Sequence, residues 1–209
     1  MDIAFEGDLH ERLIEIINLE QAGKIQVRKD LAIGSTYFKL QPEYYNGNGI
    51  FFNPKSENRF SLSDKSKWPM YLADSPHTAL SESHQGESFI DRSDFETNCM
   101  AEISTVKSLR VFDATRLAPH LRLTVGDLMG PKAVYSFTQE LAKELSKYAD
   151  GIEYLSRHTG KTCVVLWSDV VDGDGILSTV SVTPLDRYNY QGKSAKQILK
   201  AECNIQVVG

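Results

Sequence analysis

A strand-to-helix segment, Met70 to Ser83 (MYLADSPHTALSES), places a glutamate where its carboxylate could do chemistry. The apolar run 68–73 predicts a short strand, and Ser75 with Pro76 predicts a helix that begins there, since Ser favours the N-cap and Pro the first helical position. Glu82 then falls in the second turn of that helix. A carboxylate can stabilise positive charge that develops on a substrate, or deprotonate an attacking water. By position alone, however, a helix glutamate usually faces solvent.

The rest of the sequence predicts the elements that must hold this helix in place. The segment from Ser35 to Arg59 is rich in Gly, Asn, Pro and aromatic residues, which predicts a short strand followed by a long structured loop. Long loops on compact domains are often functional. Alternating or apolar runs predict further strands at 99–106, 109–112, 162–167 and 177–182.

Two amphipathic helices are predicted outside this segment. The first runs from Asp8, its cap, to Gly23, and its apolar stripe could pack on the core, dock a partner or contact a second subunit. The second spans about 137–150, with Ser136 and Gln139 as a capping box and Gly151 at its end. Together the elements predict an α+β fold with mixed, mostly antiparallel sheets and peripheral helices.

The composition fits one globular domain and excludes several classes of function. The 209 residues are 41% hydrophobic and 24% charged, so the chain can bury a core. A formal charge of −5 argues against a protein that wraps nucleic acid, which normally needs a basic face. No run approaches the roughly 18 to 20 apolar residues that span a bilayer, and the first residues are acidic where a signal peptide is basic. We therefore expect a cytosolic protein without membrane contact.

Metal and disulfide chemistry are not expected. The three cysteines, Cys99, Cys163 and Cys203, are odd in number, far apart and without the spacing of a zinc site, so reduced thiols are expected. The histidines show no HExxH or HxH spacing. The acidic run 172–175 (DGDG) lacks the length of a calcium loop and is typical of a turn between two strands.

Several motifs, in order, resemble the RES-domain family, which is named for its Arg, Glu and Ser residues. They are RF at 59–60, MYLADSPHTALSE at 70–82, VFDAT at 111–115 and LAKELSKYADGIEYLSRHTGKTCVVLW at 141–167, and the resemblance covers roughly Tyr37 to Trp167. Many members are toxins of bacterial toxin–antitoxin pairs. The resemblance implies a compact fold similar to ADP-ribosyltransferases, with NAD bound as the substrate. It also suggests one domain, with an N-terminal helical extension (1–34), a catalytic core (35–183) and a C-terminal extension (184–209).

The resemblance also implies roles for individual residues. Glu82 matches the family glutamate and would stabilise a ribosyl cation as neutral nicotinamide leaves. Arg59 matches the family arginine, whose planar guanidinium suits a pyrophosphate. Ser156 matches the family serine and could hydrogen-bond the nicotinamide amide or the ribose. Tyr71 could stack on nicotinamide, although a tyrosine of the core strand is an equally good interpretation.

One position departs from the family pattern. Members commonly carry an arginine in a Tyr-Arg or Trp-Arg pair after the first strand, and the corresponding pair here is Phe38-Lys39. Lysine keeps the charge and loses the two-pronged donor, so either Lys39 binds phosphate more weakly or the matching residue lies a few positions away.

The sequence is compatible with three functions. The first is a toxin that cleaves NAD at the nicotinamide–ribose bond, by hydrolysis or phosphorolysis, and arrests growth by depleting it. The second is a mono-ADP-ribosyltransferase that modifies a cellular protein, and the third is an inactive module that binds an antitoxin. The resemblance implies an antitoxin partner, often of the Xre type, which would make any DNA contact. The sequence identifies neither the acceptor of the ADP-ribosyl group nor the oligomeric state.

Overall fold

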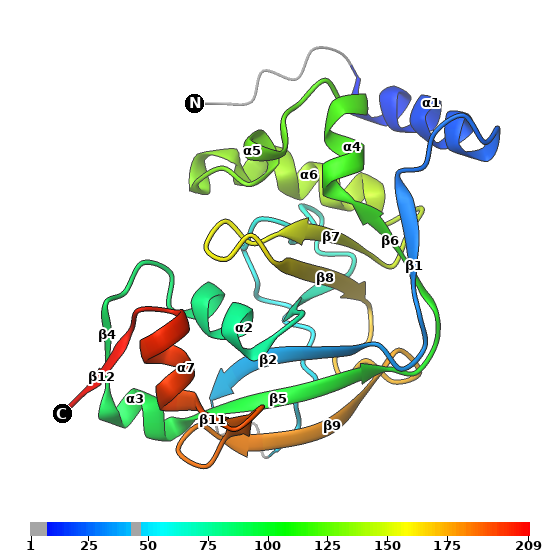
Figure 1. Ribbon diagram of the computed structural model, residues 1–209. Helices are drawn as coiled ribbons and strands as arrows, with labels where there is room; N and C mark the ends of the chain where they lie inside the picture. The colour runs from blue at the N-terminus through cyan, green and yellow to red at the C-terminus, as the bar shows by residue number, and fades with distance from the viewer. Residues whose placement is uncertain (1–7, 43–46) are drawn as a thin grey trace.

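Eight strands form one curled mixed sheet in the computed structural model, which describes residues 8–42 and 47–209 (Figure 1). The order is β1-β6-β7-β8-β3-β2-β5-β9, and every neighbouring pair is antiparallel except β6 with β7. The predicted α+β class with mostly antiparallel strands is therefore confirmed. The strands of this sheet are β1 (Arg28–Leu31), β2 (Thr36–Pro42), β3 (Trp68–Ala73), β5 (Asn98–Thr105), β6 (Leu109–Asp113), β7 (Gly151–Leu155), β8 (Thr162–Ser168) and β9 (Leu177–Pro184).

The helices gather at two ends of the curled sheet (Figure 1). One group lies beside β6 and β7 and the other beside β2 and β5, where two short strand pairs, β10 with β11 and β4 with β12, complete the fold. The first group comprises α1 (Leu9–Gln21), α4 (Ala114–His120), α5 (Val125–Leu128), the 3-10 helix η2 (Lys132–Val134) and α6 (Tyr135–Leu145). The second comprises α2 (Pro76–Ser83), α3 (Arg92–Thr97) and α7 (Ala195–Glu202), with β4 (Phe89–Asp91), β10 (Asn189–Tyr190), β11 (Lys193–Ser194) and β12 (Gln206–Val208).

Two hydrophobic clusters cover the two faces of the sheet. Alternate residues of a strand point to opposite faces, so β8 contributes Val165 and Trp167 to the larger cluster, and Val164 and Leu166 to the smaller. The larger cluster joins the sheet to the helices and includes three buried residues of α1: Leu13, Ile16 and Ile17. Of the alternatives for the first helix, the structure therefore supports packing on the core. Among the described residues, no helix is long and apolar enough to cross a bilayer.

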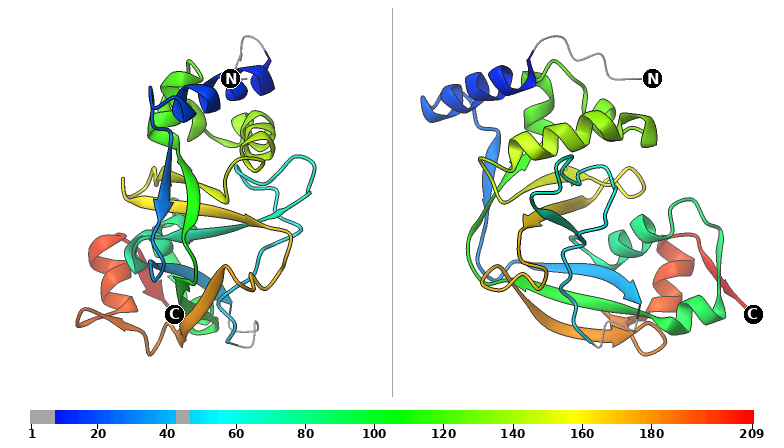
Figure 2. Two further views of the ribbon diagram at one scale, coloured as in Figure 1. Left: turned by 90° about the vertical axis from the view of Figure 1, so that its right-hand side faces the viewer. Right: turned by 180° about the vertical axis from the view of Figure 1, so that it is seen from behind.

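The sheet splits between β2 and β3. These strands pair only at Phe38 with Ala73, whereas β2 pairs with β5, and β3 with β8, along their whole lengths. Beyond the single pair the two strands diverge. The predicted loop fills the space beside this split: segment 47–67 runs along the sheet from the β9 end to the α6 end (Figure 2).

Most predicted elements are confirmed, including the predicted starts of α1 and α2. The Asp8 carboxylate accepts hydrogen bonds from the backbone N–H groups of His10 and Glu11, at 2.8 and 3.3 Å. The Ser75 hydroxyl accepts from the Thr78 N–H at 3.3 Å and caps α2, as predicted. The run 172–175 is a turn between β8 and β9, also as predicted, and none of the three cysteines forms a disulfide.

The prediction for the helix at 137–150 was wrong at both ends. α6 begins at Tyr135 as a continuation of η2 and has no side-chain cap, because Ser136 lies inside the helix. Gln139 instead donates to two loop carbonyls, those of Glu57 and Asn58, at 2.9 and 3.1 Å. The helix ends at Leu145, and Gly151 opens β7, a strand that the sequence interpretation did not include.

Candidate active site

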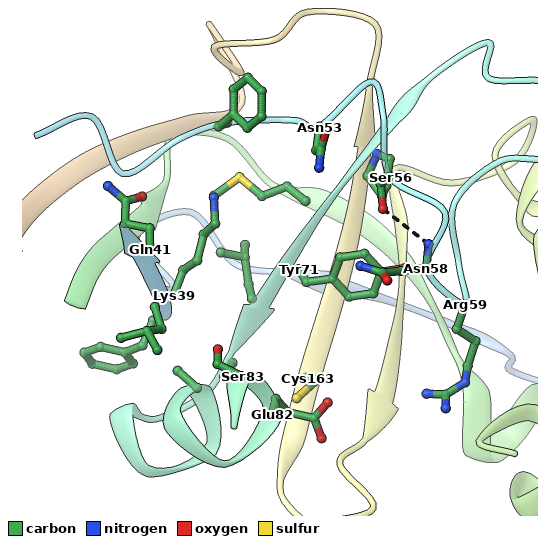
Figure 3. A pocket seen from close by; sticks show the side chains of 18 of the residues that line it. Lys39, Gln41, Asn53, Ser56, Asn58, Arg59, Tyr71, Glu82, Ser83 and Cys163 are labelled. Carbon is green, nitrogen blue, oxygen red and sulfur yellow. Dashed lines mark hydrogen bonds between the residues drawn. The ribbon is translucent and has the colours of Figure 1, made fainter. Parts of the chain in front are cut away.

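The split between β2 and β3 opens into a cavity of about 380 Å³ (Figure 3). Its walls come from the diverging segments 38–42 and 69–73, from the loop residues Asn53, Ser56, Asn58 and Arg59, and from α2. Small-molecule sites typically have volumes of about 300 to 1,000 Å³. The cavity is large enough for a small-molecule ligand, and it lies where the strand pairing ends.

Glu82 lines this cavity and is held by Ser156, which is only 2% exposed. The Ser156 hydroxyl donates to Glu82 Oε1 at 2.5 Å and accepts from the backbone N–H groups of His158 and Thr159, at 3.1 and 3.2 Å. A serine hydroxyl has one proton and two acceptor sites, so all of its hydrogen-bonding capacity is used. The hairpin that follows β7 thus fixes the carboxylate presented by α2.

Two weakly acidic side chains, Tyr154 and Cys163, flank Glu82 on neighbouring strands. They are directly paired across β7 and β8, and both line the cavity. Burial raises the pKa of both groups above their ordinary values, and the nearby charge of Glu82 raises it further. Both therefore stay protonated at neutral pH. Among the described residues that line the cavity, Glu82 is the only carboxylate.

Arg59 lies at the opposite side of the cavity from Lys39 (Figure 3). Its Nη2 donates to the backbone carbonyls of Gly130 and Met129, at 2.7 and 3.2 Å, and its guanidinium carbon is 5.5 Å from the centre of the Tyr135 ring. Its buried Nε has no hydrogen-bond partner in the described part of the chain. Because carbonyls and a ring hold the group, its positive charge is not neutralised by a carboxylate among those contacts.

Lys39 is the second cation of the cavity and is carried by β2. Burial lowers the pKa of its ammonium from 10.5 to about 8, because a charged group loses its hydration there. No carboxylate of the described residues lies within ion-pair distance of it. An anionic ligand would therefore meet two cations that form no ion pair with a carboxylate of the described residues.

Of the two interpretations of Tyr71, the structure supports the tyrosine of the core strand, and stacking on nicotinamide stays a prediction. It belongs to β3 and its hydroxyl accepts from the Phe60 N–H at 2.9 Å, so it is part of the framework. Trp167 Nε1, on β8, donates to the Phe60 carbonyl at 2.8 Å. Phe60, next to Arg59, is therefore bonded to both β3 and β8. Tyr71 also lines the cavity, near its centre in Figure 3.

The structure thus brings four of the five sequence-predicted residues, Lys39, Arg59, Tyr71 and Glu82, into the lining of one cavity. Ser156 is not part of the lining and reaches the cavity through Glu82. Sequence reasoning missed several polar or aromatic lining residues: Gln41, Asn53, Asn58, Tyr135 and Tyr154. One of these had a signal in the sequence: Gln41 lies two residues after Lys39 in β2, and alternate residues of a strand share a face.

Comparison with known proteins identifies the family and a similar fold. The model of the RES domain matches residues 40–186, which is more than half of the chain. The chain belongs to the RES domain family. A search of curated proteins found no match for this RES domain. Its fold is similar to a chain in the crystal structure of the M. tuberculosis MbcT-MbcA toxin-antitoxin complex, with a TM-score of 0.59 and 15% identity, over 84% of this chain and 92% of that one.

Proposed function

We propose that this RES domain cleaves NAD at the bond between nicotinamide and ribose, by hydrolysis or phosphorolysis. The observation that carries the proposal is the fixed Glu82 carboxylate in a cavity that also presents Arg59 and Lys39. NAD would be the substrate, and no metal is needed in this reaction scheme. Family membership supports the proposal, because RES domains in general are linked to NAD degradation.

The cavity chemistry fits the parts of NAD. The two cations would bind the pyrophosphate, and Arg59 has N–H groups that no described residue accepts from and that could donate to phosphate oxygens. The flat ring of Tyr71 is suited to stacking on the nicotinamide. Glu82 would then lie beside the ribose that carries the bond to be broken.

The reaction follows from the charges. The bond between ribose C1′ and the nicotinamide nitrogen breaks, and its electron pair leaves with nicotinamide, which becomes neutral. The positive charge passes to the ribose, where Glu82 stabilises it most in the transition state. Water or phosphate then donates an electron pair to C1′. With water, Glu82 or solvent accepts the released proton.

In a cell we propose that this activity makes the protein a toxin, restrained by an antitoxin. Its structural similarity to a chain of a toxin–antitoxin complex supports this role, and the family resemblance favours an Xre-type partner. Expression without the antitoxin should arrest bacterial growth, and co-expression should relieve the arrest.

The decisive experiment measures nicotinamide release from NAD by the purified chain, with and without phosphate. Glu82→Gln keeps an oxygen that Ser156 can reach and removes the charge, so the rate should fall by about 10² to 10³. Glu96→Gln, in an exposed pair with Arg92, is the matched control and should be unchanged. Label from NAD on a protein would indicate transfer instead. Equal rates of nicotinamide release by wild type and Glu82→Gln would contradict the proposal.

A further inference from the structure

The side-chain amide of Gln41 has a buried oxygen without a hydrogen-bond partner among the described residues. Gln41 is 2% exposed and lines the cavity, and its Oε1 makes no hydrogen bond with the described residues. Figure 3 shows its side chain on the same side of the cavity as Lys39. A buried acceptor without a donor costs free energy, so such a group in a native fold requires an explanation.

The orientation of this amide is fixed by its surroundings. Nε2 of Gln41 donates to the Asn48 carbonyl at 2.8 Å. That carbonyl can only accept, so the amide cannot turn around, and Oε1 must be the atom left over. The Asn48 side chain in turn accepts from the Ile50 N–H at 3.0 Å and from the Thr179 hydroxyl at 3.3 Å. Gln41 therefore holds a fixed acceptor in the wall of the cavity.

The position of Gln41 relates this acceptor to the rest of the site. Lys39 and Gln41 are two residues apart on β2, so they share a face and are separated by about 7 Å along the strand. Strand pairing with β3 stops at Phe38 and Ala73, and α2, which carries Glu82, starts soon after Ala73. Gln41 thus lies further along β2 from the Phe38–Ala73 pair than Lys39 does.

We propose that Gln41 Oε1 accepts a hydrogen bond from an N–H group of the dinucleotide and so selects its base. This inference rests on the proposed function, because it takes NAD as the ligand. Two groups of NAD can donate through an NH2: the 6-amino group of adenine and the carboxamide of nicotinamide. With Glu82 at the nicotinamide ribose and Lys39 at the pyrophosphate, the position beyond Lys39 belongs to adenine. Gln41 is then a specificity residue for the adenine amino group.

The test compares three dinucleotides on wild type and on Gln41→Met, which keeps the length of the side chain and lacks the amide. They are NAD, nicotinamide hypoxanthine dinucleotide, which has an oxo group in place of the adenine amino group, and nicotinic acid adenine dinucleotide, which lacks the carboxamide N–H. Wild type should lose about tenfold or more in kcat/KM with the hypoxanthine compound. Gln41→Met should treat that compound and NAD alike.

The other outcomes are also decisive. If Gln41→Met abolishes discrimination of the nicotinic acid compound only, the adenine assignment is overturned and the acceptor belongs to the nicotinamide end. If the variant discriminates all three compounds as wild type does, Gln41 is not a ligand acceptor. The comparison of the three compounds on wild type needs no substitution. If Gln41→Met folds poorly, the fall in kcat/KM of wild type with the hypoxanthine compound still tests the proposal.

Calorimetric binding of the same compounds to Glu82→Gln separates this inference from the proposed reaction. Binding that falls about tenfold without the amino group, in a protein whose wild type releases no nicotinamide, would support Gln41 and refute cleavage. Nicotinamide release without any preference among the bases would support cleavage and refute the role of Gln41. A chain that binds none of the three dinucleotides would refute both.

Discussion

Ser156 Oγ lies 2.5 Å from Glu82 Oε1 although 74 residues separate them in the chain. One belongs to the hairpin between β7 and β8, and the other to α2. The two elements meet because β8 pairs with both β7 and β3, and α2 follows β3. This contact makes the position of the carboxylate a property of the sheet, and it suggests a positioning role for Ser156 within the proposed function.

We predict that Ser156→Ala lowers kcat for NAD cleavage by about tenfold to a hundredfold, with a smaller change in KM. The substitution frees the Glu82 carboxylate to rotate and leaves the N–H groups of His158 and Thr159 without their acceptor. Steady-state kinetics with NAD is the measurement, and Ser93→Ala, at an exposed position, is the control.

Ser156→Ala should also cost about 1 to 3 kcal/mol of stability, because buried polar groups lose their partner. Rates must therefore be corrected for the folded fraction, measured by thermal unfolding. An unchanged kcat in a fully folded Ser156→Ala protein would contradict the positioning role.

The lowered pKa of Lys39 predicts that kcat/KM for NAD depends on pH. Its ammonium has a pKa of about 8, so it is charged below that pH and neutral above it. Because the proposed substrate is anionic, kcat/KM should fall about tenfold between roughly pH 7 and pH 9. Lys39→Arg should remove this fall, since a guanidinium stays charged throughout. A wild-type profile that stays flat over this range would speak against phosphate binding by Lys39.

Lys39 also makes the free energy of unfolding depend on pH, and this quantity should rise with pH where kcat/KM should fall. In the unfolded chain Lys39 keeps the ordinary pKa of 10.5, and in the folded protein it has a pKa of about 8. Between these values the unfolded state binds more protons, so this group makes the free energy of unfolding rise with pH. Urea unfolding of wild type and Lys39→Met at several pH values should show that contribution only in wild type.

Arg59→Lys should raise KM for NAD about tenfold or more and change kcat less. Lysine cannot donate to the Gly130 and Met129 carbonyls and to a phosphate in the same planar arrangement. Arg92→Lys, at an exposed ion pair, is the control and should behave as wild type. If KM for NAD stays the same in folded Arg59→Lys, the arginine does not bind the pyrophosphate.

Gly151→Ala should destabilise the protein by about 1 to 3 kcal/mol or more. A Cβ at this position would lie 2.2 Å from the backbone oxygen of Val165, which the sheet holds in place. Gly126→Ala is the matched control, since its nearest neighbour, the Thr124 hydroxyl, would lie at an ordinary 3.5 Å. Midpoints of urea unfolding measure both, and equal midpoints would contradict this explanation.

The sequence alone was sufficient for the local elements near Glu82. Ser75 and Pro76 mark the start of α2, and the apolar run before them forms β3, because capping and strand alternation depend on neighbouring residues only. Motifs in a fixed order also indicated the RES family, which the match to residues 40–186 confirms. The roles of Lys39, Arg59, Tyr71, Glu82 and Ser156 stay predictions, as does the division into extensions and core.

Tertiary structure decided what these residues face. The capping box at Ser136 and Gln139 was wrong because Gln139 bonds a loop some 80 residues away, a contact that no local pattern encodes. The splitting of β2 from β3 depends on pairing partners distant in the chain, and it creates the cavity. Only there does Gln41 become a buried acceptor and Ser156 a support for Glu82, because burial and hydrogen bonding are set by segments far apart in sequence.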